Sequence, residues 1–154
     1  MLRFTIIIFA ALCISACNPN EGAARLGLLQ DSLTIITADG QKYVFDVDLS
    51  LSQEQQRQGL MNRTELPEKT GMLFWFGGEE IERSFWMRNT LIPLDLIFVR
   101  KDGTIHHIHH NAIPYDLSPI PSNGAVAAVL EINGGLSEKL GISKGDRIKQ
   151  RFFK

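Results

Sequence analysis

Apolar and polar positions alternate most regularly in "KYVFDVDL", residues 42–49. Successive side chains of a strand point to opposite faces, so a period of two predicts a strand with one buried face. That face would hold Tyr43, Phe45, Val47 and Leu49. The preceding "TADGQ" contains Asp39-Gly40, a dipeptide typical of hairpin turns, so residues 33–36 are expected to form the partner strand.

The other apolar segments are short and are separated by turn residues. "MLFWF", Met72 to Phe76, is a continuous apolar run between glycines, which favours a strand buried on both faces. "RKDGT" is a second Asp-Gly turn. Further strands are expected at Phe85–Met87, Leu94–Val99, Thr104–His109, Ala125–Ile132 and Arg147–Phe153.

Few segments favour a helix. Ser52 followed by Gln55 fits a capping box, and Gly59 fits a helix stop, which together predict a short helix over about Gln53 to Gln58. "SEKLG" is expected to form one helical turn. Many short strands with so little helix predict a mainly β fold, a compact single-domain β-sandwich of jelly-roll-like type with one or two short helices.

The segment from Asn111 to Gly124 contains three prolines and predicts a long surface loop. Loops of this length in compact domains are often functional. One hypothesis is therefore an accessory protein whose loop docks onto a larger complex.

The N-terminus has a pattern of its own. A basic start is followed by the apolar residues 4–16, a stretch shorter than the roughly 20 residues of a membrane-spanning helix. Residues 1–16 therefore predict a secretory signal peptide. "ISAC", Ile14 to Cys17, resembles the bacterial lipoprotein box, in which the cysteine is lipidated and becomes the new N-terminus.

Lipidation of Cys17 would make residues 17–32 an anchor and flexible tether and residues 33–154 the β-rich domain. The expected location is the cell envelope, with the protein held to the membrane by its lipid on the periplasmic face. In a Gram-negative cell Asn18 resembles the signal for the outer membrane. Cys13 and Cys17 are the two cysteines of the chain, so the domain would contain no thiol for a disulfide, a nucleophile or a metal site.

The charge of the chain is nearly balanced, with 16 Lys and Arg against 17 Asp and Glu. No basic run stands out, so the sequence gives no sign of a nucleic-acid partner. Phosphate-binding glycine loops and a GxSxG motif are also absent from the sequence, and no cofactor is expected.

Several longer motifs occur in order: "RQGLMNRTELP", "GMLFWF", "FWMRNTLIPLDLIFV", "DGTI" and "VLEINGG…LGISKGD". Together they resemble the domain of unknown function 192 family over about Leu33 to Phe152. The resemblance implies a compact β-sandwich of jelly-roll type. It implies no established activity.

The segment "SFWMRNTLIPLDLIFV" carries the candidate binding residues. In the functional interpretation, Trp86 and Met87 form the floor of a cleft, and Arg57, Asn89 and Asp95 are its polar groups. Ligand pockets are mostly apolar with a few placed polar groups, and a tryptophan can also stack on a sugar or a cation.

In the structural interpretation, Trp86 and Met87 fill the core and Asn89 bonds to loop backbone. Asp95 would then pair with Arg57 or Arg63, because burying an unpaired carboxylate is costly. The sequence leaves both interpretations open.

Asp95 and Glu131 are the candidate catalytic pair. Two carboxyl groups that lie close together can act as acid and base, as in glycoside hydrolysis. The alternative for Glu131 is an ion pair with an arginine or lysine. "HHIHH", His106 to His110, offers two imidazoles on one strand face, whereas a catalytic zinc site typically has three protein ligands, so incidental surface histidines and no metal are expected.

The favoured hypothesis is a membrane-tethered envelope domain without catalytic activity, which binds a small ligand, a glycan or a protein. The alternative is a small envelope hydrolase or lyase that uses the paired carboxylates.

Overall fold

The computed structural model describes residues 27–154, which contain nine strands and two short helices. The mainly β fold with two short helices is therefore confirmed. In chain order the elements are β1 (Leu29–Ile36), β2 (Lys42–Ser50), α2 (Gln53–Gln58), β3 (Thr70–Trp75), β4 (Ile81–Phe85), β5 (Leu94–Val99), β6 (Ile105–Ala112), β7 (Ile120–Val126), β8 (Ala128–Asn133), α3 (Leu136–Lys139) and β9 (Arg147–Lys149).

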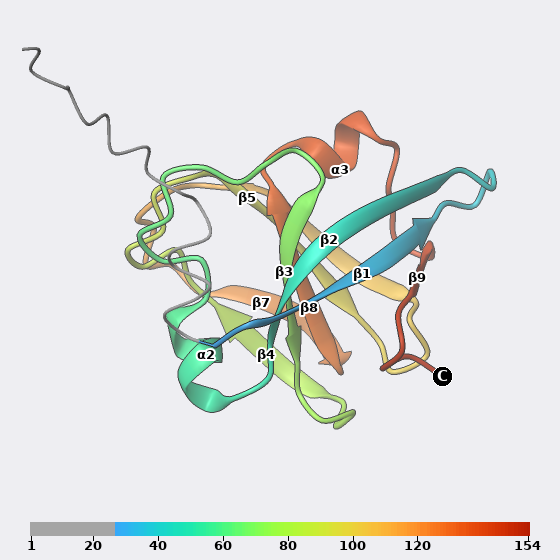
Figure 1. The fold of residues 1–154 in the computed structure, drawn as a ribbon, viewed down its shortest axis with the longest axis horizontal. Coiled ribbons are helices and arrows are strands. Elements are labelled where there is room, and N and C mark those ends of the chain that lie inside the picture. Colours follow the sequence, from blue (N-terminus) through green and yellow to red (C-terminus); the bar gives the residue numbers. More distant parts are fainter. Residues whose placement is uncertain (1–26) are drawn as a thin grey trace, which may run out of the picture.

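Seven strands form one curled sheet in the order β6-β5-β8-β3-β2-β1-β9 (Figure 1). All neighbours are antiparallel except β2 and β3. The two edges approach each other, because Thr104 forms a bridge with Arg147 and the Ile148 N–H donates to the Gly103 carbonyl at 2.8 Å. The sheet therefore curls until β9 lies against the start of β6. The strands β4 and β7 pair separately as a two-stranded sheet.

Two apolar clusters lie on opposite faces of the curled sheet. Neighbouring residues of one strand alternate between the clusters, as Leu73 and Phe74 do in β3. β1 and β9 contribute only to the first cluster, which we therefore place inside the curl. The second cluster lies between the outer face and β7, from which Ile120 and Val126 contribute.

Local sequence rules hold well around β2. Phe45, Val47 and Leu49 are buried in the first cluster, as their spacing predicts. Asp39-Gly40 lies in the turn that joins β1 to β2, and Gly40 has a φ of 86°. These predictions are confirmed.

Three predicted boundaries are wrong for identifiable reasons. The strand expected at Ala125–Ile132 is two strands, because the chain leaves β7 at Val126 and enters β8 at Ala128. The expected loop 111–124 contains most of β7; its Pro121 is tolerated because β7 is an edge strand, paired with β4 in a two-stranded sheet. β4 ends at Phe85 instead of beginning there.

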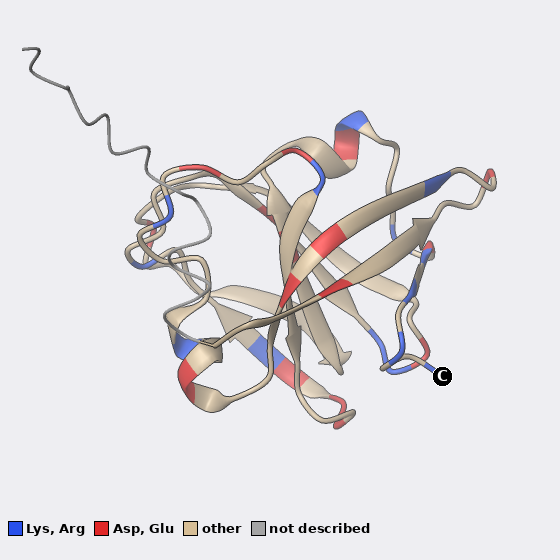
Figure 2. Ribbon diagram, viewed as in Figure 1, with Lys and Arg blue, Asp and Glu red and all other residues tan. Residues whose placement is uncertain are grey.

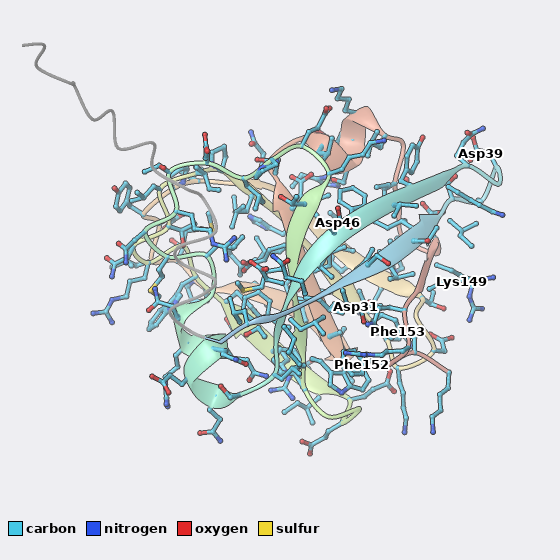
Figure 3. All side chains as sticks on the ribbon, in the orientation of Figure 1. Asp31, Asp39, Asp46, Lys149, Phe152 and Phe153 are labelled. Atoms are coloured by element: carbon cyan, nitrogen blue, oxygen red, sulfur yellow. The ribbon has the colours of Figure 1, made fainter. Side chains whose placement is uncertain are left out.

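The last predicted strand is also too long. β9 stops at Lys149, and the chain then turns so that two phenylalanines contact Trp75. Figure 3 labels these residues, Phe152 and Phe153, together with Lys149. The ring of Phe152 stacks on Trp75 with centroids 5.0 Å apart, and Phe153 meets it edge-on at 5.7 Å. Aromatic packing replaces strand pairing at this end of the domain.

Candidate functional site

A cavity of about 790 Å³ lies between α2, β4 and the outer face of the curled sheet. Its volume is within the range of small-molecule sites. Figure 1 shows α2 and β4 side by side at one end of the molecule, with α3 at the other. Arg57, Trp86, Asn89 and Glu131 all line this cavity. Asp95 is not among its lining residues.

The capping box predicted for α2 is confirmed and positions one wall of the cavity. The Gln55 N–H donates to Ser52 Oγ at 3.2 Å, and the Ser52 N–H donates to Gln55 Oε1 at 2.9 Å. Gln56 then ties the helix to the sheet by donating from Nε2 to the Trp75 carbonyl at 3.0 Å. This arrangement places Arg57, in the last turn, at the cavity.

Gly59 ends α2 at the predicted position, with a φ of 48°. A Cβ atom at this residue would lie 3.2 Å from Cζ of Phe74, which also lines the cavity. Glycine therefore allows both the left-handed backbone and the close approach of α2 to the sheet.

β4 forms the second wall and is irregular at Arg83. The register with β7 shifts between Glu82 and Ser84, so Arg83 has no paired residue. Its N–H donates to Ser122 Oγ at 2.9 Å. Such irregularities re-aim side chains at the edges of sheets. The Arg83 guanidinium lies 3.7 Å from the ring centroid of Phe76, and its Nε is buried without a hydrogen-bond partner among the described residues.

In the loop after β4, the neighbouring residues Trp86 and Met87 differ in exposure. Trp86 is 53% exposed and lines the cavity, whereas Met87 is 1% exposed and packs in the second apolar cluster. The functional interpretation expected Met87 in the floor of a cleft, but Met87 is in the core. The structural interpretation expected Trp86 in the core, but Trp86 lines the cavity. Asn89 has a φ of 52° and accepts from the Asn62 N–H at 2.8 Å.

Asp95 is fully buried and holds α3 against the sheet. Its carboxylate accepts from the Asn111 and Gly135 N–H groups at 2.7 and 2.8 Å, and from the Ser137 N–H and Oγ at 2.8 and 2.6 Å. Four donors satisfy the charge without any arginine. The role of Asp95 as a cavity group is not supported by this geometry, and neither is its pairing with Arg57 or Arg63.

Of the two candidate catalytic carboxyl groups, Glu131 is the one that lines the cavity. Its side chain is 6% exposed and forms no hydrogen bond or ion pair with another described residue. Burial raises the pKa of Glu131 to about 8, although the positive charge of Arg63 lowers it in part. The carboxyl group is therefore mostly protonated at neutral pH.

Asp95 and Glu131 cannot act together on one substrate. In the register of β5 and β8, Asp95 faces Ile132, and Leu96 faces Glu131. Paired residues point to the same side and neighbours to opposite sides, so the two carboxyl groups leave opposite faces of the sheet. The acid–base pair that the sequence suggested is not formed.

Arg63 has a partner that sequence reasoning missed. Its Nη2 lies 2.6 Å from Oδ2 of Asp48 on β2, and the two side chains are 18% and 7% exposed. Asp48, Met72 and Glu131 are cross-strand neighbours on β2, β3 and β8. Arg63 thus neutralises the charge of Asp48, and its positive charge also lowers the pKa of Glu131 in part.

Three arginines line the cavity: Arg57, Arg83 and Arg88. None takes part in the ion pairs found within residues 27–154, which join Arg63 to Asp48, Lys139 to Glu68 and Arg151 to Asp31. Figure 2 shows basic positions in blue on both α2 and β4. Because Glu82 is the other acidic residue at the cavity and Glu131 is mostly protonated, the lining carries a net positive charge at neutral pH.

The histidine run forms contacts within the fold. His106 Nε2 lies 2.9 Å from the Asn123 carbonyl oxygen, and His110 Nδ1 lies 2.9 Å from Ser137 Oγ. His107 stacks on Phe98 with centroids 5.8 Å apart. Within residues 27–154, no group of three or more His, Cys, Asp or Glu side chains is arranged to hold a metal ion.

Cys17 and the segment interpreted as a signal peptide lie outside the described residues. In the part of the chain that the structure describes, none of the helices has the length and apolar character to cross a membrane.

The model of the domain of unknown function 192 family, described as an uncharacterized ACR, matches residues 34–150. A comparison with the curated proteins found no match.

Two crystal structures are similar over nearly their whole chains. One is a Sinorhizobium meliloti 1021 protein whose name suggests a transcription regulator; it is 42% identical with a TM-score of 0.77, and the match covers 79% of this chain and 94% of that one. The other is a Novosphingobium aromaticivorans DSM 12444 protein of unknown function; it is 40% identical with a TM-score of 0.76, and the match covers 92% of this chain and 91% of that one.

Proposed function

Because the chain belongs to the domain of unknown function 192 family, whose name carries no activity, we propose a function from its cavity. The domain is a non-catalytic binding module that holds a small ligand between α2, β4 and the outer face of the sheet. The cavity provides the room, and its lining provides both aromatic surface and polar groups.

One observation carries this proposal: a mostly buried carboxyl group lines the cavity and forms no hydrogen bond or ion pair with the other described residues. This group is Glu131, which is 6% exposed. A buried polar group without a partner costs about 1–3 kcal/mol, and most such groups in folded proteins are satisfied. A ligand in the cavity would supply a partner for the Glu131 carboxyl group.

Binding without catalysis is the better interpretation, because the catalytic alternative needs two carboxyl groups at the cavity and Asp95 is not there. Asp95 is saturated by four donors on the other face of the sheet. Glu131 alone, protonated at neutral pH, has no acidic partner there except the exposed Glu82.

A thermal-shift screen tests the proposal. Envelope glycans, short peptides and small organic acids are added in turn, and a specific ligand is expected to raise the melting temperature by mass action. Ser84→Trp provides the decisive comparison, because Ser84 is exposed on β4 and lines the cavity. A tryptophan there fills the space and is expected to abolish the shift while the domain still folds. A shift that survives in Ser84→Trp would place binding elsewhere and refute the proposal.

We also propose that the module works on the periplasmic face of the cell envelope, tethered by a lipid on Cys17. The support is the sequence of the N-terminus: a basic start, a short apolar segment and "ISAC". Two or more acyl chains would give firm anchoring. Cys17→Ala is expected to move the protein from the membrane fraction to the soluble fraction in cells of a bacterial host. Equal membrane retention of both forms would contradict lipidation.

A further inference from the structure

We infer that the ligand is a small organic anion, a carboxylate carried on an apolar or aromatic body. This inference rests on the proposed binding function and adds the chemical class of the ligand. It stands on the arrangement of three arginines, a set of aromatic side chains and one buried carboxyl group around the same cavity.

Charge is the first argument. Arg57, Arg83 and Arg88 reach the cavity from α2, from β4 and from the loop after β4. None of them is in an ion pair within residues 27–154. An arginine that serves stability is often paired with a carboxylate, as Arg63 is with Asp48. Three unpaired guanidinium groups around a hollow attract an anion, because each offers several N–H donors in a fixed plane.

The orientation of Arg83 is the second argument. Its guanidinium lies 3.7 Å from the centroid of the Phe76 ring, close enough for a cation–π interaction. This contact holds the guanidinium group in place, while the buried Nε–H has no partner among the described residues. A carboxylate can accept two parallel hydrogen bonds from one guanidinium group, which is the geometry that a fixed arginine favours. A ligand carboxylate in the cavity would pair with this fixed guanidinium group.

Glu131 is the third argument. It lies at the cavity with 6% of its surface exposed and has no hydrogen-bond partner within residues 27–154. An ionised carboxylate there would repel an anion. A protonated carboxyl group instead donates one hydrogen bond to the ligand oxygen, and burial keeps the pKa of Glu131 at about 8.

Aromatic surface accounts for the rest of the ligand. Phe74, Phe85 and Trp86 line the same cavity. Phe74 and Phe85 pack edge to face, with centroids 5.4 Å apart, and Trp86 is 53% exposed. These rings contribute little to binding a bare phosphate or acetate. They favour a ligand that adds an apolar or flat body to its carboxylate.

Isothermal titration calorimetry with a matched pair of probes tests the inference on the purified full chain. Benzoate and benzamide have nearly the same shape and differ in charge. Benzoate is expected to bind at least about tenfold more tightly than benzamide, a difference of about 1.4 kcal/mol. Acetate, which lacks the ring, is expected to bind at least about tenfold more weakly than benzoate.

Variants locate the binding. Arg83→Gln is expected to weaken benzoate at least about tenfold and to leave benzamide nearly unchanged. Lys42→Gln removes one positive charge from an exposed position outside the cavity, so it controls for a general loss of charge. Equal losses in Arg83→Gln and Lys42→Gln would overturn the specific role of the arginine.

The outcomes separate the two proposals. Benzamide or a neutral glycan that binds as tightly as benzoate overturns the anion inference and leaves the binding function standing. If acetate binds as tightly as benzoate, the inference that the ligand carries an apolar body is overturned. If neither the probes nor the wider screen of glycans, peptides and acids shows binding, the proposed function fails with the inference.

Discussion

Replacing Glu131 with glutamine is expected to remove a pH-dependent loss of stability. Glutamine has nearly the same shape as a protonated glutamic acid, but it cannot ionise. Burial raises the pKa of Glu131 from its ordinary value of 4.5 to about 8 in the folded chain. In the unfolded chain the carboxyl group is solvated and regains its ordinary pKa.

The sign follows from linkage between proton binding and folding. The folded state holds the proton more tightly than the unfolded state, so this contribution to stability is fully present below about pH 4.5. It is lost as the pH rises through the window to about 8. Within that window each pH unit lowers the free energy of unfolding by up to about 1.4 kcal/mol. Between pH 5.5 and pH 8 wild type should lose about 3 kcal/mol through this group.

Urea denaturation at a series of pH values measures the effect. The free energy of unfolding of wild type minus that of Glu131→Gln is expected to fall by about 3 kcal/mol across this range. Glu82→Gln is the matched control, because Glu82 lines the same cavity from an exposed position. Its pH profile should run parallel to that of wild type. Parallel profiles for wild type and Glu131→Gln would refute the reasoning and show that Glu131 ionises freely in the folded protein.

Three further changes test the roles of other side chains. Asp95→Asn keeps one acceptor oxygen for four donors and should lower the free energy of unfolding by about 3 kcal/mol in urea denaturation, while benzoate affinity of the folded protein stays unchanged. Arg63→Met removes the ion pair of the buried Asp48, leaves it with the Gln30 Nε2 hydrogen bond at 3.2 Å, and should cost about 3 kcal/mol; it should also raise the pKa of Glu131 further, because the positive charge that lowers it is gone. Ser52→Ala removes the capping acceptor of α2 and should cost about 1 kcal/mol, measured in the same way, and an unchanged stability would contradict the capping role.

Local rules predicted the elements whose structure depends on nearby residues. The capping box at Ser52 and Gln55 appears as expected, and the alternation of β2 places Phe45 on the buried face. The boundary between β7 and β8 could not be found in this way. Residues 125–132 are apolar almost throughout, and the break at Ala127 reflects a change of partner from β4 to β3 and β5.

The cavity was predicted only in part, because its residues come from distant segments. Arg57, Trp86 and Asn89 do meet there, although the sequence places them on α2 and on a separate loop. Asp95 was expected among the polar groups of the cleft, whereas the structure places it on the other face of the sheet. Its four donors lie 16 to 42 residues away, and no local pattern reveals them.

Arg83 was missed because its importance depends on a shift of register. The sequence "EEIERS" shows only a mixed, charged segment. The shift between Glu82 and Ser84, and the contact with Phe76, exist only once β4 pairs with β7. The one sequence signal for a role of Arg83 at the cavity was an arginine between apolar segments, and this signal is weak.

The closing of the sheet has a consequence for how the domain is made. β1 pairs with β9 along one edge. Among the described strands β1 is synthesised first and β9 last, so this pairing cannot form until β9 has been made. Until the chain is complete through Lys149, the backbone donors and acceptors of Thr34 to Ile36 along that edge of β1 lack their β9 partners. A chain still growing on a ribosome therefore exposes an open strand edge, and a truncation before Arg147 would make that exposure permanent. We expect such truncated chains to self-associate through β1, with a rate that depends on their concentration.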